Sequence, residues 1–282
     1  MSERASTAAR TKTRITRRFE ELAERGELGL VAYVTAGDPS LVATEEIVLR
    51  AAEAGANVIE LGIPFSDPVA DGPTIQRASE RALRGGTTLA KVIELVGALR
   101  NKTEVPIVLF GYFNPILQMG LAEFSHRAAT AGADGVLVTD MTPEESGEYC
   151  AAMHANGLDT IFLAAPTSTD ERLRRIAEVS TGFVYVISRT GVTGAKDSLP
   201  EELPAMVRRA RNFISLPIAV GFGISVPAQV TVLGGIADAA VVGSSLVAEI
   251  EKASSANEAA QAVAARVRNL KEAAKRGVSR RG

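Results

Sequence analysis

The chain has 282 residues, 46% of them hydrophobic, and a formal net charge of −2. This length suits one large domain with a sizeable core. The nearly balanced charge gives no electrostatic reason to expect nucleic acid or a membrane surface as a partner. The single cysteine, Cys150, excludes an internal disulfide, and two histidines exclude a His-rich metal site. We therefore expect a protein of the reducing cytoplasm.

The N-terminal segment 1–18 carries six basic residues and one acid, without the apolar core of a secretory signal. We interpret it as a flexible basic arm, with a transit peptide as the alternative. Ile15, Phe19 and Leu22 have helical spacing and predict a short extra helix before the first strand. Residues 19–270 are expected to form the catalytic domain, and 271–282 a basic, solvated C-terminal tail.

Eight short apolar, β-branched runs follow in chain order and predict buried parallel strands. Helical patterns alternate with them, which indicates βαβ units and favours a single (β/α)8 TIM barrel. One uncharged stretch, 212–237, is too rich in glycine, proline and polar residues for a membrane span. The predicted strands are 30–35, 57–62, 106–111, 135–140, 160–164, 183–188, 217–221 and 239–243, and the clearest helices are 41–54, 89–100, 121–131, 143–156 and 170–179.

A short sequence repeats where predicted helices lead into strands. Segments 54–59, 131–136 and 156–161 each place a glycine at the end of a helix, where a left-handed backbone is favourable, before a turn into the next strand. Segment 234–238 is a looser fourth copy. This recurring joint favours a closed barrel over an open, doubly wound sheet.

Glu60 is an acid inside an otherwise apolar strand, on the same side as Val58 and Gly62. Burial should raise its pKa and keep a proton available near neutral pH. The alternative is an ion pair inside the barrel, but none of the eight predicted strands carries a lysine or arginine. The loop after this strand supplies Asp71, a plausible partner in acid/base chemistry, and Asp67, which we interpret as a turn former.

Small residues follow the last three strands, in segments 188–194, 221–225 and 242–245. Glycines let backbone N–H groups approach an anion, and the loops after strands seven and eight are the usual phosphate site of this fold. After the first strand, Asp38 is better explained as part of a turn and helix cap than as a catalyst. Aromatic residues near strand ends predict a flat pocket, with core packing as the alternative; these are Tyr33, Phe110, Tyr112, Tyr185 and Phe222.

Three segments together resemble the tryptophan synthase alpha subunit family: IELGIPFSDPVADGP at 59–73, YVISRTGVTG at 185–194 and GFGIS at 221–225. The resemblance runs from about residue 30 to residue 247. It implies a lyase that cleaves indole-3-glycerol phosphate to indole and glyceraldehyde 3-phosphate in a retro-aldol reaction. No metal or organic cofactor is expected on this chain. The implied partner is a beta subunit carrying pyridoxal phosphate, in an alpha2-beta2 tetramer that passes indole between subunits.

The resemblance also implies roles for individual residues. Glu60 matches the catalytic acid/base, and Asp71 matches the carboxylate that binds the indole N–H. The phosphate is expected at Gly194, Gly223, Gly243 and Ser244, and the rest of the substrate at Tyr185, Tyr33, Phe110 and Phe222. Segment 189–198 is long for a loop of this fold and is expected to close as a lid, which the Thr193 hydroxyl would fasten near Asp71.

Two departures from the family pattern are visible. Met141 and Thr142 precede Pro143 where the family has an earlier proline, in the loop that faces the beta subunit, and Ala239 replaces a glycine. Two other functions are the alternatives. Another phosphosugar barrel enzyme would need a lysine or a Cys/Asp pair at a strand end, which the chain lacks. A non-catalytic subunit that only binds a phosphorylated ligand would release no indole.

Overall fold

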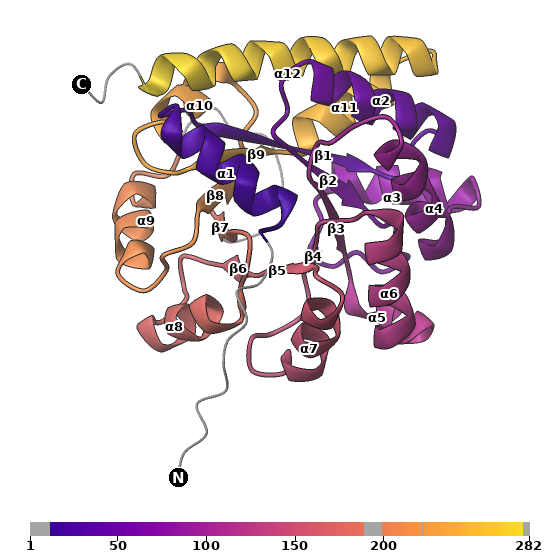
Figure 1. Ribbon diagram of the computed structural model, residues 1–282. Helices are drawn as coiled ribbons and strands as arrows, with labels where there is room; N and C mark the ends of the chain where they lie inside the picture. Colours follow the sequence, from indigo (N-terminus) through magenta and orange to yellow (C-terminus); the bar gives the residue numbers. More distant parts are fainter. Residues whose placement is uncertain (1–11, 189–198, 222, 279–282) are drawn as a thin grey trace.

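The computed structural model describes residues 12–188, 199–221 and 223–278. Its described strands form one parallel sheet that wraps around the middle of the molecule, in the order β5-β4-β3-β2-β1-β9-β8-β7-β6 (Figure 1). The strands are β1 (Gly29–Thr35), β2 (Val58–Gly62), β3 (Ile107–Gly111), β4 (Gly135–Val138), β5 (Asp159–Ile161), β6 (Leu163–Ala164), β7 (Val184–Ile187), β8 (Ile218–Gly221) and β9 (Ala239–Val242).

The barrel closes at Phe162. The strand predicted at 160–164 is divided here into β5, which pairs with β4, and β6, which pairs with β7. These two short strands are the edges of the sheet and are joined by a single residue, so together they complete the eight-stranded barrel. The TIM-barrel prediction is confirmed, and the fifth strand differs from expectation only in this break.

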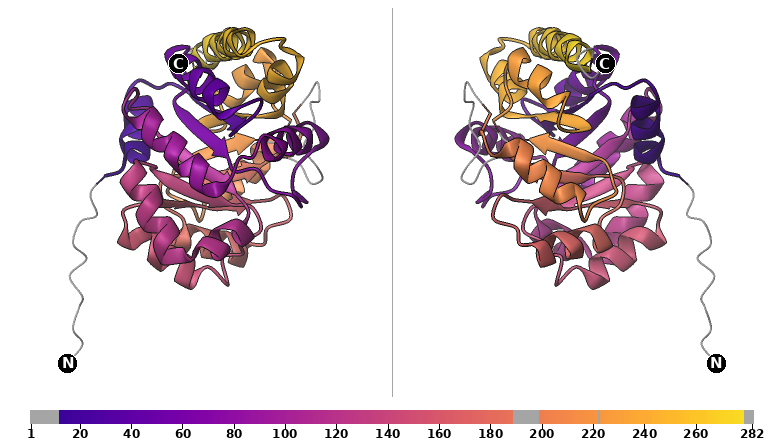
Figure 2. Two further views of the ribbon diagram at one scale, coloured as in Figure 1. Left: turned by 90° about the vertical axis from the view of Figure 1, so that its right-hand side faces the viewer. Right: turned by 90° about the vertical axis from the view of Figure 1, so that its left-hand side faces the viewer.

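Helices form the outer layer around the strands (Figure 2). None of the helices in the described ranges is both long and apolar enough to cross a membrane. The helix predicted at 143–156 begins later, because residues 143–146 form a turn in which Ser146 Oγ donates to the Pro143 carbonyl at 2.9 Å. The helices are α1 (Arg14–Glu24), α2 (Leu41–Glu53), α3 (Pro73–Arg84), α4 (Leu89–Arg100), α5 (Phe113–Met119), α6 (Leu121–Ala131), α7 (Gly147–Ala155), α8 (Asp170–Val179), α9 (Leu203–Arg211), α10 (Pro227–Leu233), α11 (Ser244–Lys252) and α12 (Ala256–Val278).

Helix α1 lies across the amino ends of the strands and covers the barrel floor (Figure 1). Ile15, Phe19 and Leu22 are buried among inward side chains of the strands, which confirms the predicted extra helix. Gly135 provides room for it, since an added Cβ would lie 3.1 Å from Ile15 Cδ1. The helix begins at Arg14, so the expected boundary of the arm at residue 18 falls inside α1.

The repeated joint takes the predicted conformation at three places. Gly55, Gly132 and Gly157 all have positive φ, with values of 109°, 93° and 77°. The looser fourth copy is an exception to the glycine expectation, because Gly234 ends α10 in the right-handed region.

The polar residue at the end of a joint also ties two strands together. The side chains of Asn57, Asp134 and Asp238 each accept a hydrogen bond from a backbone N–H near the start of a neighbouring strand, at 2.9, 2.8 and 2.7 Å. Their own N–H groups donate back to the same residues, Leu30, Ile107 and Ile218. The joints therefore pair neighbouring strands on the floor of the barrel.

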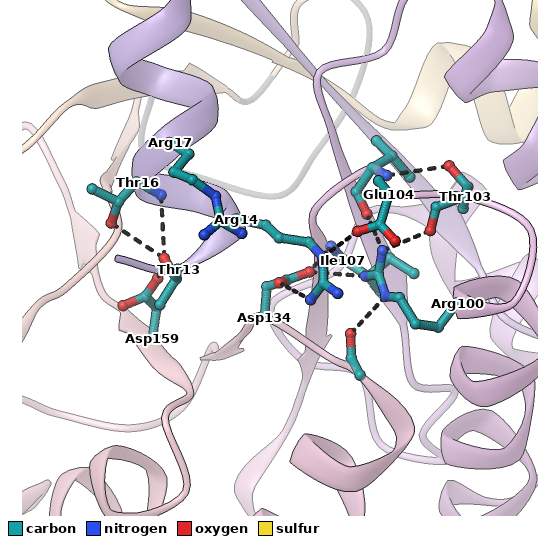
Figure 3. Close-up of polar contacts among 12 residues, drawn as sticks. Thr13, Arg14, Thr16, Arg17, Arg100, Thr103, Glu104, Ile107, Asp134 and Asp159 are labelled. Atoms are coloured by element: carbon teal, nitrogen blue, oxygen red, sulfur yellow. Dashed lines mark hydrogen bonds and ion pairs between the residues drawn. The ribbon is translucent and has the colours of Figure 1, made fainter. Parts of the chain in front are cut away.

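Charged groups reinforce this floor around Asp134 (Figure 3). Its carboxylate accepts from Ile107 N, from Arg100 at 2.9 Å and from Arg14 at 3.1 Å. Thr13, the cap of α1, donates its hydroxyl to Asp159 at 2.5 Å. Helix α1 is thus held to the floor by polar contacts as well as by apolar packing.

The long helix α12 lies against α2 and α10 on the outside of the barrel (Figure 1). Lys271, which we expected to begin a solvated tail, is instead buried. Its ammonium donates to Asn57 Oδ1 at 3.0 Å and to the Leu28 carbonyl at 3.3 Å. The helix is amphipathic here, with Ala273 and Ala274 also buried, so this part of the expected tail belongs to the packed domain.

Candidate active site

A cavity of about 300 Å³ lies at the carboxyl ends of the strands. Chemistry in this fold takes place at that end, because the βα loops there converge over the barrel. Thr193, Gly194 and Phe222, and the whole expected lid, lie outside the described residues. With the exception of Tyr112, the other expected acid/base, substrate and phosphate residues line this one cavity: Tyr33, Glu60, Asp71, Phe110, Tyr185, Gly223, Gly243 and Ser244.

Glu60 points into the barrel from the middle of β2, between Tyr33 on β1 and Val108 on β3. Its side chain is 1% exposed. Within the described part of the chain its buried Oε1 has no hydrogen-bond partner. Burial raises the pKa of Glu60 from 4.5 to about 8. The carboxyl group is therefore protonated at neutral pH and available to a ligand in the cavity.

Asp71 lies in the loop that leads from β2 to α3 and is 6% exposed. The Tyr112 hydroxyl donates to its Oδ2 at 3.1 Å. Burial raises the pKa of Asp71 to about 6, against the opposite effect of the Tyr112 hydrogen bond. At neutral pH Asp71 is mostly ionised while Glu60 holds its proton, so the two carboxyl groups are suited to different roles.

The other two candidate aspartates do not line the cavity. Asp38 is buried, and Arg81 on α3 donates to both of its carboxylate oxygens at 2.7 and 2.8 Å. Asp67 is exposed and accepts a hydrogen bond from the neighbouring Ser66 hydroxyl. A cation on α3 therefore accounts for Asp38, and a neighbouring hydroxyl accounts for Asp67.

The aromatic wall is built over glycines. Tyr33 packs edge-to-face against Phe110, with ring centroids 5.2 Å apart. A Cβ at Gly62 would lie 2.3 Å from the Tyr33 hydroxyl oxygen, and one at Gly221 would lie 2.0 Å from the Tyr185 hydroxyl oxygen. These two glycines make space for inward tyrosines. For Gly221, in the segment 221–225, this is a different role from the expected contact of the glycines there with an anion.

The opposite side of the cavity has the properties of an anion site. Gly243 caps helix α11, whose first residue is Ser244, and both line the cavity. Gly223, in the loop after β8, has a φ of 86° that favours glycine. The amino end of α11 presents unpaired backbone N–H groups and the positive end of the helix dipole. This arrangement suits a phosphate group.

Several residues that line the cavity were not predicted from the sequence. These residues have no sequence signal beyond their place near a strand end. They are the apolar residues Ala70, Ile75, Leu163, Ala165, Ile187, Ile224 and Val241, and the polar residue Thr139. Tyr112 is the opposite case, a residue that was predicted to line the cavity and does not. It was expected in the aromatic pocket, yet it lies behind Asp71, with its ring against Phe65 at a centroid distance of 5.1 Å.

The geometry defines a class of protein. A protonated buried acid and an ionised one share a cavity with the amino end of a helix, at the carboxyl end of a parallel barrel. These features are those of a TIM-barrel enzyme acting on a small phosphorylated substrate. Among the described residues no cluster of three or more His, Cys, Asp or Glu is placed to hold a metal ion.

Comparison with known proteins identifies the family. The model of the family "Tryptophan synthase alpha chain" matches residues 19–275. The chain is 53% identical over 240 residues to the tryptophan synthase alpha chain of Citrifermentans bemidjiense, covering 85% of this chain and 90% of that one. It is 48% identical over 261 residues to that of Geobacter sulfurreducens, covering 93% and 98%.

Solved structures of tryptophan synthase have the same fold as this chain. Tryptophan synthase subunit alpha from Legionella pneumophila superposes with a TM-score of 0.86 at 36% identity, covering 94% of this chain and 99% of that one. A chain of Mycobacterium tuberculosis tryptophan synthase gives 0.86 at 34% identity, covering 93% and 98%. The chain belongs to the tryptophan synthase alpha chain family. It is a lyase of tryptophan biosynthesis that carries out the alpha reaction, cleavage of indole-3-glycerol phosphate, together with a beta subunit.

Proposed function

We propose that this chain cleaves the carbon–carbon bond of indole-3-glycerol phosphate in a retro-aldol reaction, with Glu60 as the acid/base and Asp71 as the carboxylate that binds the indole N–H. The observation that carries this assignment is the pair of buried carboxyl groups in one cavity whose pKa values are raised to about 8 and about 6. Two such groups provide a proton donor and an anion at the same pH.

Glu60 acts twice. Its carboxyl group first gives a proton to the indole carbon that bears the glycerol chain, which makes a cationic indolenine. The resulting carboxylate then takes the proton of the hydroxyl group on the adjacent carbon. The carbon–carbon bond breaks as that carbon becomes the aldehyde of glyceraldehyde 3-phosphate, and its electron pair restores the indole ring. Glu60 ends the cycle protonated, as it began.

Asp71 stabilises the intermediate between these steps. The positive charge of the indolenine resides at the ring nitrogen, so an ionised carboxylate that accepts its N–H lowers the energy of the cation. This interaction is stronger with the cation than with the neutral substrate, which is the condition for a contribution to rate. Ionised Asp71 is therefore the electrostatic partner of protonated Glu60.

The rest of the cavity orients the substrate. Tyr33, Phe110 and Tyr185 form apolar walls suited to a planar ring, and Gly223, Gly243 and Ser244 form the phosphate end near α11. We also assign Phe222 to the indole pocket and Gly194 to the phosphate site. The Thr193 hydroxyl is assigned to closure of the loop over the substrate. Separate subsites for the ring and the phosphate fix the scissile bond between them.

Indole leaves this chain for a partner. We propose a beta subunit carrying pyridoxal phosphate, assembled with this chain as an alpha2-beta2 tetramer in the cytoplasm. The loop containing Thr142 would face that partner; here Thr142 is half-buried and donates to Glu145 at 3.0 Å. The alpha reaction itself is assigned to side chains of this chain alone, without a metal or organic cofactor.

Adding indole-3-glycerol phosphate to the purified full chain tests the proposal. Release of indole and glyceraldehyde 3-phosphate in equal amounts, with no metal or cofactor added, is the expected result. Binding of the substrate without release of either product would instead support a subunit that only binds the phosphorylated ligand. Isomerisation without cleavage would support a different phosphosugar barrel enzyme.

A further inference from the structure

We propose that Tyr112 is the positioning residue for Asp71, holding one carboxylate oxygen so that the other is presented to the substrate. This inference rests on the proposed role of Asp71. Tyr112 immediately precedes α5, at the carboxyl end of β3, and is 3% exposed. It does not line the cavity, so it acts through Asp71 and not on the substrate.

The Tyr112 hydroxyl has a defined orientation. It accepts the backbone N–H of Ala70 at 3.0 Å and donates its proton to Asp71 Oδ2 at 3.1 Å. Because the Ala70 N–H occupies an acceptor position on the hydroxyl oxygen, the hydroxyl proton is directed to Asp71. One tyrosine hydroxyl thus hydrogen-bonds to two successive residues, Ala70 and Asp71, of the loop that carries the carboxylate.

Asp71 is held from its backbone as well. Its carbonyl accepts from Gln76 Nε2 at 2.9 Å, and its N–H donates to the Pro68 carbonyl at 3.0 Å. These bonds fix the main chain but leave the carboxylate free to rotate. Among the described residues, the Tyr112 hydroxyl is the side-chain group that orients the carboxylate itself. It engages Oδ2, which leaves Oδ1 for the indole N–H.

The ring of Tyr112 is itself immobilised. It packs against Phe65 at 5.1 Å, at the start of the same loop, so tyrosine and loop form one packed unit across β2 and β3. Packing of this kind lowers the entropy cost of holding a hydroxyl on one acceptor. The Tyr112–Asp71 contact also joins residues 41 positions apart, which makes it independent of the local turn.

The contact has an electrostatic effect that can be measured. A donor to the ionised form lowers the pKa of a carboxyl group, and Tyr112 has this effect on Asp71 against the opposing effect of burial. Burial and Asp71 together raise the pKa of Tyr112, so it remains a donor throughout the working range. Among the described residues, the other titratable groups that line the cavity with Asp71 are Glu60, Tyr33 and Tyr185, and none of these lining residues is a lysine, arginine or histidine.

Tyr112→Phe tests the proposal, with the full chain and indole-3-glycerol phosphate. Loss of the donor should raise the pKa of Asp71 and move the acidic limb of the kcat/KM profile upward by about one pH unit. At pH 7 kcat should fall about tenfold with little change in KM. In an Asp71→Asn background the same substitution should cause no further loss of rate, because its effect passes through the carboxylate.

Tyr149→Phe is the matched control. Tyr149 is also a buried tyrosine, and its hydroxyl donates to the Val136 carbonyl at 3.2 Å, away from the cavity. It should lose stability comparably but keep the parental pH profile. An unmoved acidic limb in a folded Tyr112→Phe chain, or additive losses with Asp71→Asn, would overturn the proposal while leaving the proposed function intact. A parent chain that releases no indole would instead overturn the proposed function.

Discussion

The hydroxyl of Tyr185 stands directly over Gly221 on the neighbouring strand, where an added Cβ would come within 2.0 Å of the hydroxyl oxygen and 2.5 Å of the ring carbon that bears it. Both residues are buried at the mouth of the barrel. The glycine at this position is therefore a steric requirement of the tyrosine, and the two positions should respond to substitution as a unit.

Gly221→Ala should displace the Tyr185 ring, lower kcat/KM and reduce stability by about 1 to 3 kcal/mol, as overpacking does. Tyr185→Phe should not relieve it, because the ring carbon remains too close. Tyr185→Val should relieve the clash, so that the double variant is more stable than Gly221→Ala alone. Urea unfolding of the single and double variants checks this. Strict additivity would show that the two side chains do not compete for space.

Glu60→Gln should abolish most of the cleavage, by about 10² to 10⁴ in kcat, while the substrate still binds. The substitution keeps the size of the side chain and removes the transferable proton. Single-turnover measurement of indole release, with calorimetric binding of the substrate, separates the two effects. Near-normal turnover would remove Glu60 from the mechanism.

The same variant supplies its own folding control. The pKa of Glu60 is raised from 4.5 to about 8 in the folded chain, so the folded state holds a proton that the unfolded chain releases. The stability that Glu60 contributes is present below pH 4.5 and is lost as the pH rises through 8. Above that pH Glu60→Gln should be at least as stable as the parent chain, and denaturant unfolding of the two chains checks this.

Activity should follow a bell-shaped pH profile. Glu60 must be protonated, so kcat/KM should fall as the pH rises above about 8. Asp71 must be ionised, so it should fall as the pH drops below about 6. The plateau lies between these values, and an Asp71→Asn chain should lose the acidic limb. A profile that is flat from pH 5 to pH 10 would contradict both assignments.

Gly223→Val should weaken binding of glycerol phosphate more than binding of free indole, because a side chain would obstruct backbone N–H groups at the phosphate end. Gly120→Val is the matched control, since Gly120 has a φ of 89°, close to the 86° of Gly223, and an added Cβ there meets nothing within 4 Å. It carries the same backbone strain away from the cavity. Calorimetric titration with each ligand distinguishes the two. Equal loss of both ligands in Gly223→Val would indicate general misfolding.

Asp134→Ala should destabilise the barrel by about 2 to 4 kcal/mol, because it leaves the Ile107 N–H without its side-chain acceptor and removes the buried carboxylate that pairs with Arg100 and Arg14. Glu104→Ala is the control. It removes the other partner of Arg14, a carboxylate whose side chain is 78% exposed, and should change the free energy of unfolding much less than Asp134→Ala does. Denaturant unfolding measures both, and kcat should change little in either. A small effect of Asp134→Ala would mean that α1 and its packing alone hold the floor.

The sequence by itself determined the barrel fold and indicated where a buried acid and a phosphate site would lie at its mouth. Apolar runs of strand length, separated by helical patterns and joined at Gly55, Gly132 and Gly157, define repeating units whose parallel strands must be covered on both faces. Glu60 was identifiable because a carboxyl group in an apolar strand without an interior cation is costly unless it has a function. Glycine loops after the last three predicted strands predicted a phosphate site at that side of the barrel mouth. These signals are local, since each depends on neighbours within one strand or turn.

Tertiary structure alone decided which polar groups meet. Arg81 reaches Asp38 across 43 positions, and Tyr112 reaches Asp71 across 41, and no local pattern specifies either pair. The sequence assigned Tyr112 to the pocket because strand ends converge there, yet packing against Phe65 turns its hydroxyl to the back of the carboxylate. Lys271 likewise lies in a segment with the composition of a solvated tail, and it is buried because α12 packs on the outside of the barrel where Lys271 reaches the Leu28 carbonyl and Asn57. Side-chain direction depends on the neighbours that close packing brings together, and those are set by the whole barrel.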